Sequence, residues 1–166
     1  NEEISAIVLY QTGALNAFCK AHDTSVSYVK PHGGLYHDMM NNENVFKAIL
    51  SAISSYDKNI KLMILSSPKN EEYALIAKAY NISLLYELFA DRNYNDDGSL
   101  VSRSQSNAVI DDEQLVIKRI KDLKEKGTLN SISGKELSLA TDVLCVHGDT
   151  KNALEFIKIL RKEITE

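Results

Sequence analysis

The sequence alternates between short apolar runs and longer stretches that have the periodicity of an amphipathic helix. Loops rich in Gly, Asp or Pro separate the two kinds of segment. The short runs predict strands at 26–30, 61–65, 82–89 and 142–147, with a weaker strand at 129–133. The longer stretches predict helices over 3–21, 43–56, 70–80, 111–126 and 150–164. Strands that alternate with helices are typical of βα units, so we expect an α/β protein with a parallel sheet.

Length and composition predict a single folded domain, residues 1–166. The chain is 44% hydrophobic and 25% charged, values typical of globular proteins, which excludes a disordered chain. The formal net charge is -4, so there is no excess of basic residues to neutralise the phosphates of a nucleic acid or to hold an anionic membrane.

Apolar runs and cysteines bear on the predicted compartment. No apolar run approaches the ~20 residues that span a bilayer, and the first residues lack the basic-then-apolar order of a signal peptide. Cys19 and Cys145 lie far apart in apolar runs, which predicts buried thiols rather than a disulfide. These features favour the cytoplasm.

Three polar groups follow predicted strands at the point where each strand ends. Residues 30–34 follow the first strand, residues 90–92 follow the third, and residues 147–150 follow the last. The carboxyl ends of parallel strands carry the sites of α/β barrels and of open α/β sheets. We therefore predict a functional rim at this edge.

In the first group, Pro31 favours an extended Lys30, and two glycines after His32 allow close approach of a ligand to the backbone. A histidine at this place can be a general base or a metal ligand, or it can simply hydrogen-bond loop backbone. Lys30 can hold an anion or be an ordinary lysine at the end of a strand. Both alternatives stay open for both residues.

The second group contains Asp91 and Arg92. The two side chains can form a structural salt bridge. Alternatively Asp91 is a base or a ligand, and Arg92 or Arg103 clamps a carboxylate or phosphate through the guanidinium fork. The acidic stretch 96–98 is expected to be a turn.

In the third group, Asp149 or Thr150 can cap the last helix and leave backbone N–H groups for an anion. Capping does not explain His147, for which a rim residue and a buried, hydrogen-bonded histidine are the alternatives. The sequence contains no P-loop, no Gly-x-Ser-x-Gly elbow and no paired cysteines, which excludes a Walker-type ATP site, a nucleophile elbow and a zinc knuckle.

Several blocks in order resemble the LamB/YcsF family, which provides the A component of the prokaryotic ATP-dependent 5-oxoprolinase. The matching blocks are 10–15, 29–33, 89–92, 97–101 with Arg103, 131–134 and 146–149. The family carries a preceding segment with an Asp-Leu-Asn-type strand and a Gly-Phe-His-Ala-Gly-Asp motif, and neither occurs in this sequence. The resemblance is therefore to the C-terminal two thirds of the family.

The resemblance implies a distorted TIM-like (β/α) barrel of the glycoside hydrolase/deacetylase superfamily type, incomplete because the first strands are absent. It also implies opening of 5-oxoproline to L-glutamate driven by hydrolysis of ATP to ADP and phosphate, in a complex with the 5-oxoprolinase subunits B and C.

Seven residues of the rim are our candidates for this chemistry. They are His32, His147 and Asp91 for catalysis, Lys30, Arg92 and Arg103 for binding carboxylate or phosphate, and Asp149, with His32 or His147, for a possible divalent metal. Two alternatives remain: a metal-dependent amide or carbohydrate deacetylase of the same fold, in which the metal activates water, and an inactive fragment that binds partners.

Overall fold

The computed structural model describes residues 1–146, 148 and 153–165, which form two compact units. Unit 1 comprises Asn1–Leu65 and Asn70–Tyr86, and unit 2 comprises Ser66–Lys69 and Glu87–Glu166. Each unit has a hydrophobic cluster of its own. In the described part of the chain, no helix is long and apolar enough to cross a bilayer. The expectation of one domain stays a prediction.

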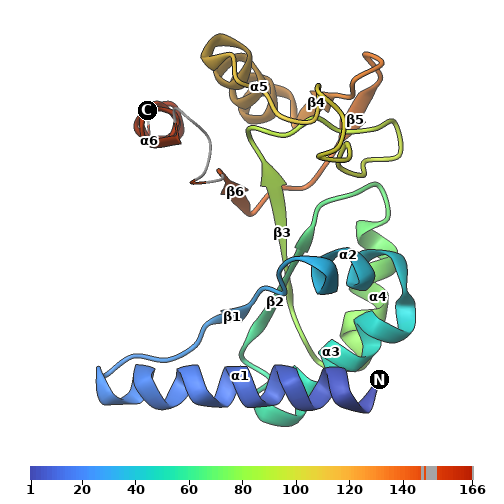
Figure 1. Ribbon diagram of the computed structural model, residues 1–166, viewed down its shortest axis with the longest axis vertical. Helices are drawn as coiled ribbons and strands as arrows, with labels where there is room; N and C mark the ends of the chain where they lie inside the picture. Colours follow the sequence, from blue (N-terminus) through green and yellow to red (C-terminus); the bar gives the residue numbers. More distant parts are fainter. Residues whose placement is uncertain (147, 149–152, 166) are drawn as a thin grey trace. The chain divides into compact units, whose positions relative to one another are not determined.

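Unit 1 contains the first four helices and the first strands (Figure 1). Its elements are α1 (Glu2–Ala21), β1 (Tyr28–Val29), α2 (Gly34–Asn41), α3 (Glu43–Tyr56), β2 (Lys61–Leu65), α4 (Asn70–Ala79) and the first half of β3 (Leu84–Phe89). β1 pairs in parallel with β2, with Val29 opposite Leu62. The Leu62 N–H donates to the Ser83 carbonyl at 3.0 Å, which places β3 on the other side of β2.

The core of unit 1 forms around α3 because its apolar residues recur with the helical period. Phe46, Ile49, Leu50 and Ile53 are all at most 1% exposed. The side chain of Asn42 caps the helix by accepting the Asn44 N–H at 3.0 Å. The long helix α1 packs on α3 along the lower edge of Figure 1.

Unit 2 contains the second half of β3 and the elements that follow it. These are α5 (Glu113–Lys126), β4 (Thr128–Asn130), β5 (Glu136–Ser138), β6 (Val143–Cys145) and α6 (Ala153–Thr165). β3 pairs in parallel with β6, and β4 and β5 form an antiparallel hairpin. The core cluster comprises Ala90, Ile110, Val116, Ile120 and Leu160. Helix α5 ends at Gly127, whose φ of 69° is the left-handed conformation favoured at helix C-termini.

Several predicted elements are confirmed and others are corrected. The strand 61–65 and the helix 43–56 have the predicted bounds. The first strand is shorter than predicted, because only two of its residues pair with β2. The predicted strand 129–133 is β4, which ends at Asn130 where the hairpin turns, and its partner β5 and the helix α2 were not predicted.

The two cysteines are half-buried rather than buried. Cys19 lies in the last turns of α1, where the neighbouring Phe18 is 71% exposed, so little of unit 1 covers this part of the helix. Cys145 lies at the end of β6, a strand whose three residues are all half-buried.

Candidate functional site

The predicted site residues fall in both units, and two of them cannot be placed. In unit 1, Lys30 is half-buried and His32 is exposed, directly after β1. Asp91, Arg92 and Arg103 lie in unit 2. The remaining candidates, His147 and Asp149, lie outside the described residues.

The loop after β1 is shaped by a glycine that follows His32. Gly33 has a φ of 60° and immediately precedes α2. This left-handed conformation favours glycine, and it lets the chain turn from the end of the strand into a helix within a few residues. His32 is exposed in this loop, and its role in a functional rim stays a prediction.

The segment after β3 places a carboxylate and a guanidinium in the interior of unit 2. Asp91 is 1% exposed and Arg92 is 6% exposed. The guanidinium of Arg92 donates from Nε to the Ala108 carbonyl at 3.1 Å and from Nη2 to the Val101 carbonyl at 2.6 Å. The Asp91 carbonyl accepts the Ile110 N–H at 2.8 Å. These bonds hold residues 91–92 against the chain at 101–110.

Charge interactions group three of the predicted residues. Burial lowers the pKa of Arg92, the nearby positive charge of Arg103 lowers it further, and the negative charge of Asp91 opposes both effects. Arg103 itself is exposed. The structure thus brings Asp91, Arg92 and Arg103 together in one part of unit 2, with one cation buried and the other in contact with solvent.

Arg119 is a contact of this segment that the sequence reasoning missed. From α5, its Nη1 donates to the Arg92 carbonyl, and its Nη2 donates to Asn93 Oδ1 at 3.0 Å. Its guanidinium carbon lies 5.8 Å from the ring centroid of Tyr94. A signal existed in the sequence, because Arg119 lies three residues after the buried Val116 and so on the side of the helix that faces the core.

The acidic stretch 96–98 forms the predicted turn, and it is tied to the β4–β5 hairpin. The Gly98 N–H donates to the Asn95 carbonyl at 3.0 Å. Asp96 Oδ1 accepts the hydroxyls of Ser131 and Ser133, each at 2.6 Å. These two hydrogen bonds lower the pKa of Asp96. The serines of block 131–134 therefore anchor a loop in this structure.

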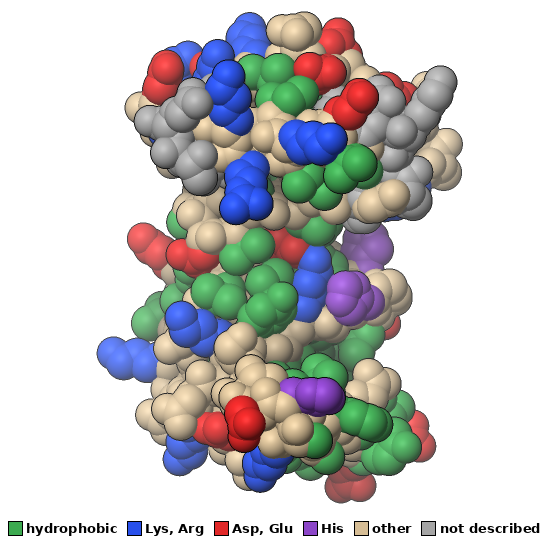
Figure 2. Space-filling model, turned by 90° about the vertical axis from the view of Figure 1, so that its left-hand side faces the viewer, with side chains coloured by type: hydrophobic (Ala, Val, Ile, Leu, Met, Phe, Trp, Pro, Cys, Tyr) green, Lys and Arg blue, Asp and Glu red, His purple; other side chains and the backbone are tan. Residues whose placement is uncertain are grey.

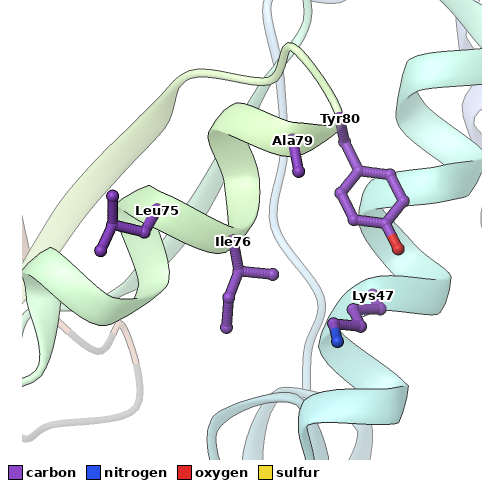
Figure 3. A pocket seen from close by; sticks show the side chains of 5 residues that line it. All are labelled: Lys47, Leu75, Ile76, Ala79 and Tyr80. Carbon is purple, nitrogen blue, oxygen red and sulfur yellow. The ribbon is translucent and has the colours of Figure 1, made fainter.

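A shallow groove in unit 1 lies apart from all the predicted residues. It has a volume of about 560 Å³ between α3 and α4 and is lined by Lys47, Leu75, Ile76, Ala79 and Tyr80 (Figure 3). The ammonium group of Lys47 already pairs with Glu43 at 2.5 Å. The groove therefore offers mainly apolar surface, with the Tyr80 side chain and the paired Lys47 as its polar groups.

Surface charge and metal ligands can be assessed for the described residues. On the face drawn in Figure 2, Lys and Arg side chains are interspersed with acidic and apolar ones rather than gathered in one basic surface.

Over residues 1–146, 148 and 153–165, no three His, Cys, Asp or Glu side chains cluster so that they could hold a metal ion. The metal site at Asp149 stays a prediction, because Asp149 and His147 are outside those residues.

Comparison with known proteins decides the family. The profile of the LamB/YcsF family matches residues 1–166. The chain belongs to the LamB/YcsF family. The 5-oxoprolinase A subunit of Vibrio campbellii is 42% identical over 164 residues, which are 99% of this chain and 64% of that protein. The 5-oxoprolinase A subunit of Pyrococcus abyssi is 40% identical over 165 residues, again 99% of this chain and 64% of that protein.

A solved structure confirms the fold class. The crystal structure of the lactam utilization protein from Thermus thermophilus matches with a TM-score of 0.86 and 32% identity, over 99% of this LamB/YcsF chain and 64% of that chain. Together with the parallel strand pairs, this confirms the predicted α/β fold, part of a TIM-like barrel. The chain spans less than two thirds of the length of these relatives.

Proposed function

We propose that this chain is part of the A subunit of a 5-oxoprolinase, which opens 5-oxoproline to L-glutamate as ATP is hydrolysed to ADP and phosphate. The observation that carries the proposal is the similarity of 99% of the chain to proteins named as the A subunit of 5-oxoprolinase. The name of the solved relative, a lactam utilization protein, agrees with a cyclic amide as substrate. The activity is proposed for the complete A subunit, because this chain covers about 64% of its relatives.

The reaction requires groups that the predicted rim contains. Opening the lactam adds water across the C–N bond, so the hydroxyl goes to the carbonyl carbon and a proton must reach the ring nitrogen. The substrate also carries a carboxylate, and ATP carries phosphates, both of which favour Lys and Arg. We assign proton transfer to His32, His147 and Asp91, and anion binding to Lys30, Arg92 and Arg103. A divalent metal, held by Asp149 with His32 or His147, would help to neutralise the phosphates of ATP.

The proposed partners follow from the names of the relatives. A protein named as one lettered component of an enzyme works with other components, and we propose the 5-oxoprolinase subunits B and C as the partners of this chain.

The test is production of glutamate and ADP from 5-oxoproline and ATP with subunits B and C present. The complete A subunit is compared with the 166-residue chain and with the His32→Ala and His147→Ala variants of the complete protein. His37→Ala is the matched control for His32→Ala, because His37 is also an exposed histidine of unit 1.

We expect the complete A subunit to be active, with a large loss in the His32 and His147 variants but not in the His37 control. Unchanged turnover in both His32→Ala and His147→Ala would contradict the assignment of proton transfer to these histidines. An inactive complete A subunit, with B and C competent beside another A subunit, would contradict the proposed function. Bound zinc with ATP-independent hydrolysis of acetylated substrates would then favour the deacetylase alternative.

A further inference from the structure

We propose that Arg119 is a positioning residue of the proposed 5-oxoprolinase site, fixing the main chain that carries Asp91 and Arg92. The inference rests on the proposed function, because that function gives Asp91 and Arg92 their catalytic and anion-binding tasks. Arg119 lies on α5, 27 residues from Arg92 in sequence, so its effect depends on the folding of unit 2.

The geometry of the guanidinium is the first argument. One terminal nitrogen donates to the Arg92 carbonyl and the other to Asn93 Oδ1. The group is planar and its N–H directions are fixed, so two acceptors that it binds together are also fixed relative to each other. Asn93 is held from a second side, because its Nδ2 donates to the Asn107 carbonyl at 2.8 Å. The peptide between Arg92 and Asn93 is thus tied to both α5 and the chain near residue 107.

The ring of Tyr94 is the second argument. Tyr94 is fully buried, and its hydroxyl accepts the Phe89 N–H at 2.8 Å. The turn 89–94 is therefore closed by a side chain from its own end, with Asp91 and Arg92 inside it. The guanidinium of Arg119 is 5.8 Å from the centroid of this ring, a distance at which a cation and an aromatic ring attract. Arg119 therefore contacts both the main chain of the turn, at the Arg92 carbonyl, and the ring of Tyr94 that closes the turn.

The partial burial of the charge is the third argument, because Arg119 is half-buried. Burial lowers the pKa of Arg119, and the effect is opposed by Tyr94 and by the negative charge of Asp91. A cation taken out of water is costly unless its N–H groups find acceptors. A neutral side chain would avoid that cost, and a lysine would present all its N–H groups from one nitrogen, whereas Arg119 donates from two nitrogens held in one rigid plane. The arrangement is suited to a role that needs the fork of an arginine.

The experiment uses the complete A subunit with subunits B and C, and compares Arg119→Ala, Arg119→Lys and Val116→Ala. Val116 is 1% exposed on the same helix and belongs to the same core cluster as Ala90, but its side chain cannot hydrogen-bond the turn 89–94. Val116→Ala therefore controls for loss of core packing without loss of the Arg119 hydrogen bonds. Steady-state kinetics are measured at a temperature below the thermal unfolding of every variant, with and without low millimolar guanidinium. Hydrogen–deuterium exchange is followed in peptides that cover 89–95.

We expect Arg119→Ala and Arg119→Lys to lower kcat by about 10- to 100-fold, with KM for 5-oxoproline changed by less than about threefold. Guanidinium should restore part of the kcat of Arg119→Ala and none in Val116→Ala. Exchange at 89–95 should rise in both Arg119 variants and rise less in Val116→Ala.

Parent-like exchange at 89–95 in Arg119→Ala would overturn the inference, whatever the activity. Equal kcat in Arg119→Ala and a Val116→Ala variant of equal stability would also overturn it, because stability would then explain the loss. If the unmodified A subunit with B and C produced no glutamate, the proposed function would fail. The positioning role would fall with it, even if exchange at 89–95 rose in the Arg119 variants.

Discussion

The hydroxyl of Tyr94 allows a direct test of the closure after β3. Tyr94→Phe removes one oxygen from a fully buried side chain and keeps the ring that Arg119 contacts. That oxygen accepts the Phe89 N–H at 2.8 Å. Loss of one partner of a buried hydrogen bond costs about 1–3 kcal/mol. For a protein of about 150–250 residues, each kcal/mol shifts Tm by about 2–4 °C, so a loss of about 2 kcal/mol lowers Tm by about 4–8 °C.

The assay is thermal unfolding of the complete A subunit followed by far-ultraviolet circular dichroism. Tyr10→Phe is the matched control, since it removes the same oxygen from a tyrosine that is 77% exposed, and we expect its Tm to change by less than about 1 °C. Equal Tm values for the Tyr94 and Tyr10 variants would refute the reasoning, because the buried hydrogen bond would then contribute nothing measurable.

Two further predictions concern the turn at 96–98. Gly98 has a φ of 83°, and a Cβ there would lie 2.5 Å from Pro68 Cδ, so Gly98→Ala should lower the free energy of unfolding by about 2–4 kcal/mol in urea titrations. Gly134→Ala is the control: Gly134 has a φ of 89° and no atom near the added carbon, so the substitution should cost only the backbone strain of about 1–2 kcal/mol. Equal losses of unfolding free energy in the two variants would contradict the proposed clash with Pro68. The pKa of Asp96 is lowered from its ordinary value near 3.8, so its contribution to stability is present above about pH 4 and is lost as the pH falls through the folded-state pKa. Asp96→Asn should therefore lose less stability than the parent between pH 6 and pH 3, and identical pH profiles of urea unfolding would count against this.

The helices and strands with a clear hydrophobic pattern were the ones that the sequence predicted best. In α3, the four most buried residues follow the helical period, and the helix has its predicted bounds. In β2, four consecutive buried residues end a strand whose bounds were also predicted. α2 was missed because it has one buried residue, Met39, and begins at a Gly-Gly pair that reads as a loop. β5 was missed because three residues with one buried leucine are too short to show a period.

Residue type and strand order predicted where to look for a site, but contacts between distant segments could not be predicted. Asp91 and Arg92 follow β3 as expected from the sequence. The Arg92 guanidinium binds the carbonyls of Val101 and Ala108, which the fold of residues 93–108 brings beside it. The sequence alone does not show whether Arg92 binds these carbonyls or a ligand. Arg119 was missed for the same reason. The proposed function came from the ordered blocks of the family, because no single motif in the sequence specifies a lactam substrate.

The contacts of Arg92 and Arg103 suggest different tasks for two residues that the sequence treated alike. Arg92 is 6% exposed, and two of its nitrogens donate to backbone carbonyls, so much of its fork holds the loop 101–108 in place. Arg103 is exposed and sits at the start of that loop, close enough to lower the pKa of Arg92. An incoming carboxylate or phosphate reaches the exposed cation with the smaller loss of hydration, because it need not enter the interior of unit 2. The proposed anion contact therefore fits Arg103 better, while the buried charge of Arg92 adds to the positive potential that such an anion would meet.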